Sequence, residues 1–135
     1  KSLGCVQKSG SADVEDVIEI GGSVTRKGLN LLTGPGNDIV AVTNLTASGC
    51  HLILFSTGRG TPVGAPVPTV KIATNTNLAK RKPHWIDFNA GEIINGADLT
   101  DELFEYVIEV ANGKRTNNEK NGYKEISIFK DGVVL

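Results

Sequence analysis

The fold is decided by the stretch from residue 52 to residue 75, which reads LILFSTGRGTPVGAPVPTVKIATN. It contains two short apolar runs, 52–55 and 69–73, separated by a loop rich in glycine and proline, residues 56–68. Runs of this length between glycine and proline predict strands, and the consecutive apolar positions of 52–55 are typical of a strand covered on both faces. We therefore expect two strands joined by a long loop that its prolines stiffen.

The segments on either side also show strand and helix patterns. Asn37 or Asp38 can cap a helix that begins after them, and Gly49 can end it. An order of strands and helices of this kind is typical of α/β domains, and we expect a three-layer, Rossmann-like sandwich with a mainly parallel sheet. Beyond the two strands above, we predict strands at 29–32, 84–88 and 126–129, helices at 39–48, 78–82 and 99–111, a mobile polar loop at 114–125, and either a strand or a short helix at 14–20.

Length, charge and hydropathy exclude several classes of protein. A chain of 135 residues fits one domain, and 14 lysines and arginines against 15 aspartates and glutamates leave it almost neutral. Such a balance argues against binding to nucleic acids or anionic membranes, which needs a basic surface. No apolar run approaches the roughly 18 residues of a membrane-spanning helix. The basic run 80–82 is interpreted as a solvated helix end, since cations are favourable at helix C-termini.

The cysteines indicate the redox compartment of the chain, and the absence of methionine indicates whether Lys1 is a translational start. Its two cysteines form no metal motif, and Cys50 is interpreted as a small buried residue in a reducing cytoplasm. A disulfide in a secreted protein stays open as the alternative. The sequence contains no methionine, so we do not expect Lys1 to be a translational start. We therefore expect an excised domain, a cleaved product or a trimmed fragment.

Four polar clusters directly follow predicted strands: 34–38, 57–60, 74–76 and 89–91. Because ligands of an open parallel sheet bind beyond the carboxyl ends of its strands, we expect the four clusters to line one rim. The residues predicted to bind a substrate there are Asn37, Asp38, Thr57, Gly58, Arg59, Gly60, Asn75 and Asn89.

Arg59 is the most informative of these residues, because glycines flank it on both sides. Glycine lets the backbone turn sharply and approach an anion closely, and a guanidinium binds a carboxylate or phosphate through two parallel hydrogen bonds. The alternative is an exposed loop arginine between turn glycines. The spacing is not that of a P-loop, since no Lys-Ser or Lys-Thr pair follows it.

Lys71 and Asp87 are charged residues inside otherwise apolar predicted strands. An unpaired ammonium is costly to bury, so three functional interpretations are open for Lys71: it lies near the rim, it pairs with a carboxylate, or it acts as a base with a lowered pKa. The alternative is a structural one, a partly exposed lysine on an edge strand. Asp87 pairs with Lys71 or Arg59, binds a metal, or accepts hydrogen bonds from the 89–91 turn. Lys71, Arg59 and Asp87 are the predicted catalytic residues.

Four stretches together resemble the altronate/galactarate dehydratase family. They read GPGND at 34–38, LFSTGRGTP at 54–62, PVPTVKIATN at 66–75 and WIDFNAG at 85–91. The combination is specific although each stretch alone is weak, and the likeness is looser outside residues 28–91. Enzymes of this family are larger, multidomain, cytoplasmic proteins. The resemblance therefore implies that residues 1–135 are a single C-terminal domain, and that an amino-terminal and a middle domain lie outside the sequence.

The resemblance also implies a reaction. Enzymes of the family remove water from a hexonate or hexarate, giving a 2-keto-3-deoxy acid, and depend on a divalent metal such as iron or manganese. No cluster in this sequence is expected to hold a metal alone, so its ligands should come mainly from the middle domain. The isolated chain is therefore expected to be inactive.

The partners and rival functions follow from the same resemblance. The expected partners are the sugar-acid substrate and the rest of the same polypeptide, while a homo-oligomer stays open. The nearest rival function is a sulfo-lyase acting on sulfolactate, because an anion-binding arginine suits a sulfonate equally well. The rivals from other classes are a non-catalytic ligand-binding module and a purely structural domain.

Overall fold

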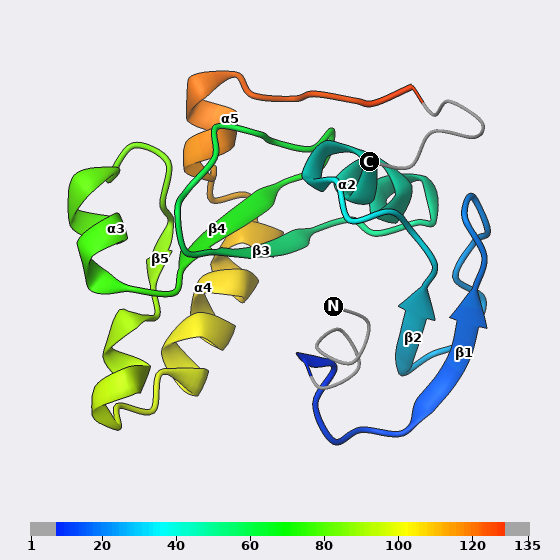
Figure 1. Ribbon diagram of the computed structural model, residues 1–135, viewed down its shortest axis with the longest axis horizontal. Coiled ribbons are helices and arrows are strands. Elements are labelled where there is room, and N and C mark those ends of the chain that lie inside the picture. Colours follow the sequence, from blue (N-terminus) through cyan, green and yellow to red (C-terminus); the bar gives the residue numbers. More distant parts are fainter. Residues whose placement is uncertain (1–7, 129–135) are drawn as a thin grey trace.

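The computed structural model describes residues 8–128 and contains helices and parallel strands in open sheets (Figure 1). This arrangement confirms the α/β fold class. In chain order the elements are β1 (Val14–Ile18), β2 (Leu29–Leu32), α2 (Asp38–Ala47), β3 (Ile53–Thr57), β4 (Thr69–Ala73), α3 (Thr76–Arg81), β5 (Phe88–Asn89), the 3-10 helix η1 (Gly91–Asn95), α4 (Thr100–Ala111) and α5 (Asn117–Asn121).

The described strands pair in parallel, in two separate sheets. β3, β4 and β5 form a three-stranded sheet with β4 in the centre, and the register of β3 and β4 runs from Ile53 opposite Thr69 to Thr57 opposite Ala73. β1 and β2 form a two-stranded sheet of their own. The predicted parallel pairing is confirmed, but the strands are divided between two sheets.

Strand β4 is the centre of the core, because all five of its residues are buried. Val70 and Ile72 pack on one face against Val110 of α4. Successive side chains of a strand point to opposite faces, so Ala73 lies on the other face, where it packs against Leu78 of α3. Burial of apolar surface on both faces of β4 therefore fixes α3 and α4 against the sheet.

Helix α2 connects the two sheets and matches the helix predicted at 39–48. Asn37 caps its start by accepting hydrogen bonds from two backbone N–H groups of the first turn, and Gly49 follows its end with a left-handed φ of 106°. Asn44 of this helix is buried, and it accepts a hydrogen bond from the Gly21 N–H and donates one to the Thr33 carbonyl. These two bonds attach α2 to the segments that leave β1 and β2.

Two strand predictions need correction. The sequence predicts that 52–55 is covered on both faces, but β3 is an edge strand and α4 packs over its neighbour β4, so Leu54 is 50% exposed. The strand predicted at 84–88 is reduced to Phe88–Asn89, because the chain leaves α3 through a turn in which the Trp85 N–H donates to the Lys82 carbonyl. Segment 14–20, where strand and helix both stayed open, contains strand β1.

The mobile loop predicted at 114–125 is wrong, because this segment contains α5. Thr116 and Glu119 form a capping box in which each side chain binds the other residue's backbone N–H. Thr116 and Asn118 are buried, and α5 packs against β4. A five-residue helix whose buried side chains are polar has no apolar periodicity, so the sequence pattern missed it.

The last predicted strand, 126–129, is absent over the part that the structure describes. Residues 126–128 pair with no strand, and the Ser127 N–H donates instead to Thr43 Oγ1 of α2. Phe129 lies outside the described residues. Within residues 8–128, no helix is long and apolar enough to span a membrane.

Candidate anion-binding site

The ends of strands β3, β4 and β5 bring three of the four polar clusters together. Since the three strands are parallel and in register, the segments 57–60, 74–76 and 89–91 leave the sheet at the same edge. Hydrogen bonds then join the clusters to one another. They run from Thr74 N–H to the Thr57 carbonyl (3.0 Å), from Asn75 Nδ2 to the Gly58 carbonyl (3.1 Å) and from Asn89 Nδ2 to Thr76 Oγ1 (3.3 Å).

The fourth cluster, 34–38, does not join this rim. It follows β2, which belongs to the two-stranded sheet, and α2 lies at the opposite end of β3 and β4 from α3 (Figure 1). Asn37 caps α2, and Asp38 is exposed in the first turn of that helix. The expectation of one rim shared by four clusters is therefore wrong for 34–38, because a local pattern does not reveal which sheet a strand joins.

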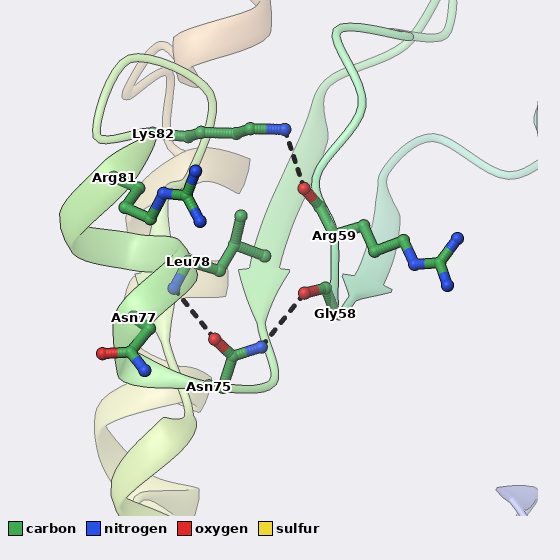
Figure 2. A pocket seen from close by; sticks show the side chains of 7 residues that line it. All are labelled: Gly58, Arg59, Asn75, Asn77, Leu78, Arg81 and Lys82. Atoms are coloured by element: carbon green, nitrogen blue, oxygen red, sulfur yellow. Dashed lines mark hydrogen bonds between the residues drawn. The ribbon is translucent and has the colours of Figure 1, made fainter.

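Side chains hold the backbone of the loop after β3, and we call residues 57–65 the Arg59 loop. Its first half is held by its own first residue, Thr57, and by Asn75 and Lys82, the two residues that flank α3; Figure 2 shows the bonds from Asn75 and Lys82. The hydrogen bonds run from Asn75 Nδ2 to the Gly58 carbonyl (3.1 Å), from Lys82 Nζ to the Arg59 carbonyl (2.8 Å) and from Gly60 N–H to Thr57 Oγ1 (2.9 Å).

The second half of the Arg59 loop is held from β4, from α5 and from the segment that follows α5. The bonds run from Lys71 Nζ to the Thr61 carbonyl, from Asn118 Nδ2 to the Val63 carbonyl (3.3 Å), from Gly64 N–H to Glu125 Oε2 (2.8 Å) and from Ala65 N–H to Thr69 Oγ1 (3.2 Å). A loop whose backbone is bound at so many positions loses little further freedom when it binds a ligand.

Arg59 itself leaves its side chain free. Its guanidinium is exposed and points away from α3 (Figure 2), and it forms no hydrogen bond or ion pair with any residue in the described range 8–128. The Gly60 N–H, in contrast, is occupied by Thr57 and offers nothing to an anion. An unpaired guanidinium on a fixed backbone is a preorganised partner for a carboxylate or phosphate.

A pocket of about 250 Å³ separates the Arg59 loop from α3 (Figure 2). Asn75 shapes one end, because it caps α3 through the Leu78 N–H while it holds the Gly58 carbonyl. Arg81 and Lys82 make the pocket basic. The residues that line it are Gly58, Arg59, Asn75, Asn77, Leu78, Arg81 and Lys82.

Arg81 and Lys82 are site residues that the sequence interpretation missed. The sequence predicts a solvated helix end for both, but α3 is only six residues long, and its last turn lines the pocket together with the Arg59 loop. Lys82 also lies over the Trp85 ring, with Nζ 4.6 Å from the ring centre, and this contact steadies the ammonium that holds the Arg59 carbonyl. The signal available in the sequence was the short distance between the 74–76 cluster and the basic run 80–82.

Lys71 is fully buried in the centre of β4 and does not reach the rim. Its ammonium makes no ion pair among residues 8–128; it donates to the Thr61 carbonyl and lies 5.3 Å from the centre of the Phe55 ring. Burial lowers the pKa of Lys71 to about 8, although Asp87, Glu125 and Asp38 act in the opposite direction. Because Lys71 is buried in the central strand, the partly exposed edge position that stayed open for it is ruled out.

Asp87 connects β4 to α5 and is not paired with either predicted cation. Its Oδ2 accepts the Lys71 backbone N–H (2.8 Å), its Oδ1 accepts the Asn117 N–H (2.7 Å), and the Tyr106 hydroxyl lies 3.5 Å from Oδ1. Burial raises the pKa of Asp87, and the two backbone hydrogen bonds oppose that rise. The link to Lys71 therefore runs through the backbone and not through the ammonium. The Gly91 N–H of the 89–91 turn, one of the partners that stayed open for Asp87, donates instead to Asn89 Oδ1 (3.0 Å).

Asp87→Asn is expected to lower the free energy of unfolding of the chain by about 1–3 kcal/mol. Both carboxylate oxygens accept a backbone N–H, whereas an amide has one acceptor oxygen, so the variant leaves one N–H facing another donor. Urea denaturation followed by the fluorescence of the single tryptophan measures the change. Asp98→Asn, at an exposed carboxylate before α4, is the matched control. Equal midpoints for the two variants would contradict the assignment.

The described residues 8–128 contain no group of three or more His, Cys, Asp or Glu side chains that could hold a metal ion. The charged side chains that line the pocket are those of Arg59, Arg81 and Lys82. These groups suit an anionic ligand and supply no metal ligands.

Comparison with protein families now decides the relationship. The family model described as "D-galactarate/Altronate dehydratase, C-terminal" matches residues 1–134. The chain belongs to this dehydratase family. The match covers the Arg59 loop, the basic pocket and all three strands that position them.

Individual relatives agree with the family. The chain is 56% identical to altronate dehydratase of Escherichia coli K12 and 53% identical to altronate dehydratase of Bacillus subtilis 168, in each case over 100% of this chain and 28% of the relative. It is 37% identical to galactarate dehydratase (L-threo-forming) of Escherichia coli K12, over 99% of this chain and 27% of the relative. The chain thus spans little more than a quarter of the length of these dehydratases.

Proposed function

We propose that this chain is the C-terminal domain of a cytoplasmic hydro-lyase that removes water from altronate, or from a related hexonate or hexarate, and gives a 2-keto-3-deoxy acid. The observation that carries the proposal is the identity of more than half of the residues with two altronate dehydratases along the whole chain. The lower identity to a galactarate dehydratase favours a hexonate over a hexarate.

The chemistry of such a dehydration explains what the Arg59 loop contributes. A proton leaves the carbon next to a carboxylate and hydroxide leaves the neighbouring carbon, so negative charge develops as an enediolate that needs cationic stabilisation. Arg59 binds the substrate carboxylate, since its guanidinium is unpaired in the described part of the chain and its backbone is fixed. Thr57, Gly58, Gly60 and Asn75 hold the loop around it, and Asn89 holds the adjoining turn.

The divalent metal expected for the family, iron or manganese, does not fit the described residues of this domain. No group of three or more His, Cys, Asp or Glu side chains among residues 8–128 could hold it. The metal ligands are assigned to the part of the dehydratase that this chain does not span.

The main macromolecular partner is the rest of the same polypeptide. The outer side of α4 exposes Phe104 (64%) and Ile108 one turn later, and Asp101 and Glu105 flank them on the helix surface. This face combines apolar and acidic side chains, so it suits a surface of the remaining dehydratase that carries apolar and basic side chains.

The proposal is tested by assaying the intact enzyme, and the 135-residue chain alone, with altronate, galactarate and sulfolactate. The intact enzyme is expected to form a 2-keto-3-deoxy acid fastest from altronate, to lose activity with a chelator and to regain it with iron or manganese. The isolated chain is expected to show no turnover, because the metal ligands are assigned to the rest of the enzyme. Release of sulfite from sulfolactate without dehydration of altronate would favour the sulfo-lyase instead.

A further inference from the structure

Lys71 is a buried charge whose presence the fold does not explain. It stands at the centre of the innermost strand, is 0% exposed, and has no carboxylate at ion-pair distance among residues 8–128. An apolar side chain of the same length would fill the space without the cost of removing an ammonium from water.

The sign of that cost follows from the protonation equilibrium. Burial lowers the pKa of Lys71 from 10.5 to about 8, so between these values the folded chain binds fewer protons than the unfolded chain. The free energy of unfolding therefore rises as the pH rises through that window, and below about pH 8 the charged form of Lys71 costs stability. Because the charged Lys71 lowers the stability of the fold at neutral pH, its presence is better explained by a role in function.

The hydrogen bond of the ammonium indicates that role. Lys71 Nζ donates to the carbonyl of Thr61, two residues after Arg59 in the same loop. Lys82, the residue that ends α3, donates to the Arg59 carbonyl (2.8 Å). Lysines on two different elements thus hold the backbone at Arg59 and at Thr61. The Lys71 side chain is fully buried, and a charge-assisted hydrogen bond is stronger where water is excluded.

We propose that Lys71 is a positioning residue for Arg59: its protonated side chain binds the Thr61 carbonyl and holds the Arg59 loop in the conformation that presents the guanidinium. The neutral amine binds the carbonyl more weakly and lets the loop move. Three carboxyl groups on the surrounding elements act electrostatically on Lys71: Asp87 before β5, Glu125 after α5 and Asp38 at the start of α2. All three are carboxylates that favour the ammonium without pairing with it. The inference rests on the proposed role of Arg59 in the dehydration.

The first test compares Lys71→Met with the parent in the intact dehydratase. The thioether has nearly the length of the lysine side chain and no donor, so kcat/KM at about pH 7 is expected to fall roughly ten- to a hundredfold, as a misplaced binding group costs. In the parent, kcat/KM should decline as the pH rises through about 8, and the variant should lack that decline. Lys27→Met, at an exposed lysine between β1 and β2, is the control and should keep the parent profile. A parent-like rate and profile in Lys71→Met would overturn the proposal.

The second test follows the Arg59 loop by NMR spectroscopy and does not require the Lys71→Met variant. In NMR spectra of the parent chain, the backbone amide signals of Gly60, Val63 and Gly64 are expected to shift with a midpoint near the pKa of Lys71, about 8. If these signals do not titrate, the proposal fails even when Lys71→Met does not fold. If they titrate while Arg59→Ala keeps full activity, the positioning of the loop stands and the proposed role of Arg59 fails.

Discussion

Replacing Arg59 by alanine in the intact dehydratase is expected to lower kcat/KM by about 10²–10³-fold, the usual loss when one fixed donor to a developing anion is removed. The Arg59 guanidinium forms no hydrogen bond or ion pair with any residue in 8–128, so its truncation removes a binding group and breaks no such internal bond. The variant should therefore fold normally. Steady-state kinetics with altronate, together with thermal unfolding, check both statements.

Three further variants locate the anion more closely. Arg59→Lys keeps the charge but loses the two parallel hydrogen bonds, so it should recover only part of the activity. Arg26→Ala removes an exposed arginine between β1 and β2 and is expected to behave like the parent. Arg81→Ala tests the pocket side of the loop. A large loss of activity in Arg81→Ala together with full activity in Arg59→Ala would show that the substrate carboxylate binds at Arg81 in the pocket, and it would refute the role given to Arg59.

The parts of this site that could be predicted are those encoded locally. Strand β4 was predicted with the bounds that it has, because a short apolar run between a proline-rich loop and a polar turn is a clear pattern. The cap at Asn37 and the glycine after α2 were equally visible, since both depend on residues within one turn of the helix end.

What the sequence did not reveal depends on partners far apart in the chain. The ammonium of Lys71 finds a backbone carbonyl, and every residue type carries one, so no pattern could point to Thr61. The separation of β1 and β2 from the other strands is likewise a matter of pairing and not of composition. Asn118, which holds the Val63 carbonyl, lies in a helix whose polar sequence resembles a loop. The sequence thus reveals that a charged residue inside an apolar strand is unusual, but it does not reveal the residue to which that side chain binds.

Gly91→Ala is expected to lower the free energy of unfolding by about 3 kcal/mol, the upper part of the usual range for overpacking. A Cβ at this position would lie 2.7 Å from the Asn75 carbonyl carbon and closer still to the Thr76 backbone nitrogen. Neither atom belongs to a flexible side chain, so either the turn after β5 or the start of α3 must move. The close packing of these two backbones requires glycine.

Gly36→Ala is the matched control, since a Cβ at Gly36 meets no atom within 4 Å and the residue has no left-handed φ. It should stay within about 1 kcal/mol of the parent, because such a change mainly restricts the unfolded chain. Urea denaturation of the chain measures both variants. Movement of Asn75 would also release the Gly58 carbonyl, so Gly91→Ala in the intact enzyme should lower kcat/KM as well as stability. Equal denaturation midpoints for the two glycine variants would show that the turn after β5 does not hold α3 against the Arg59 loop.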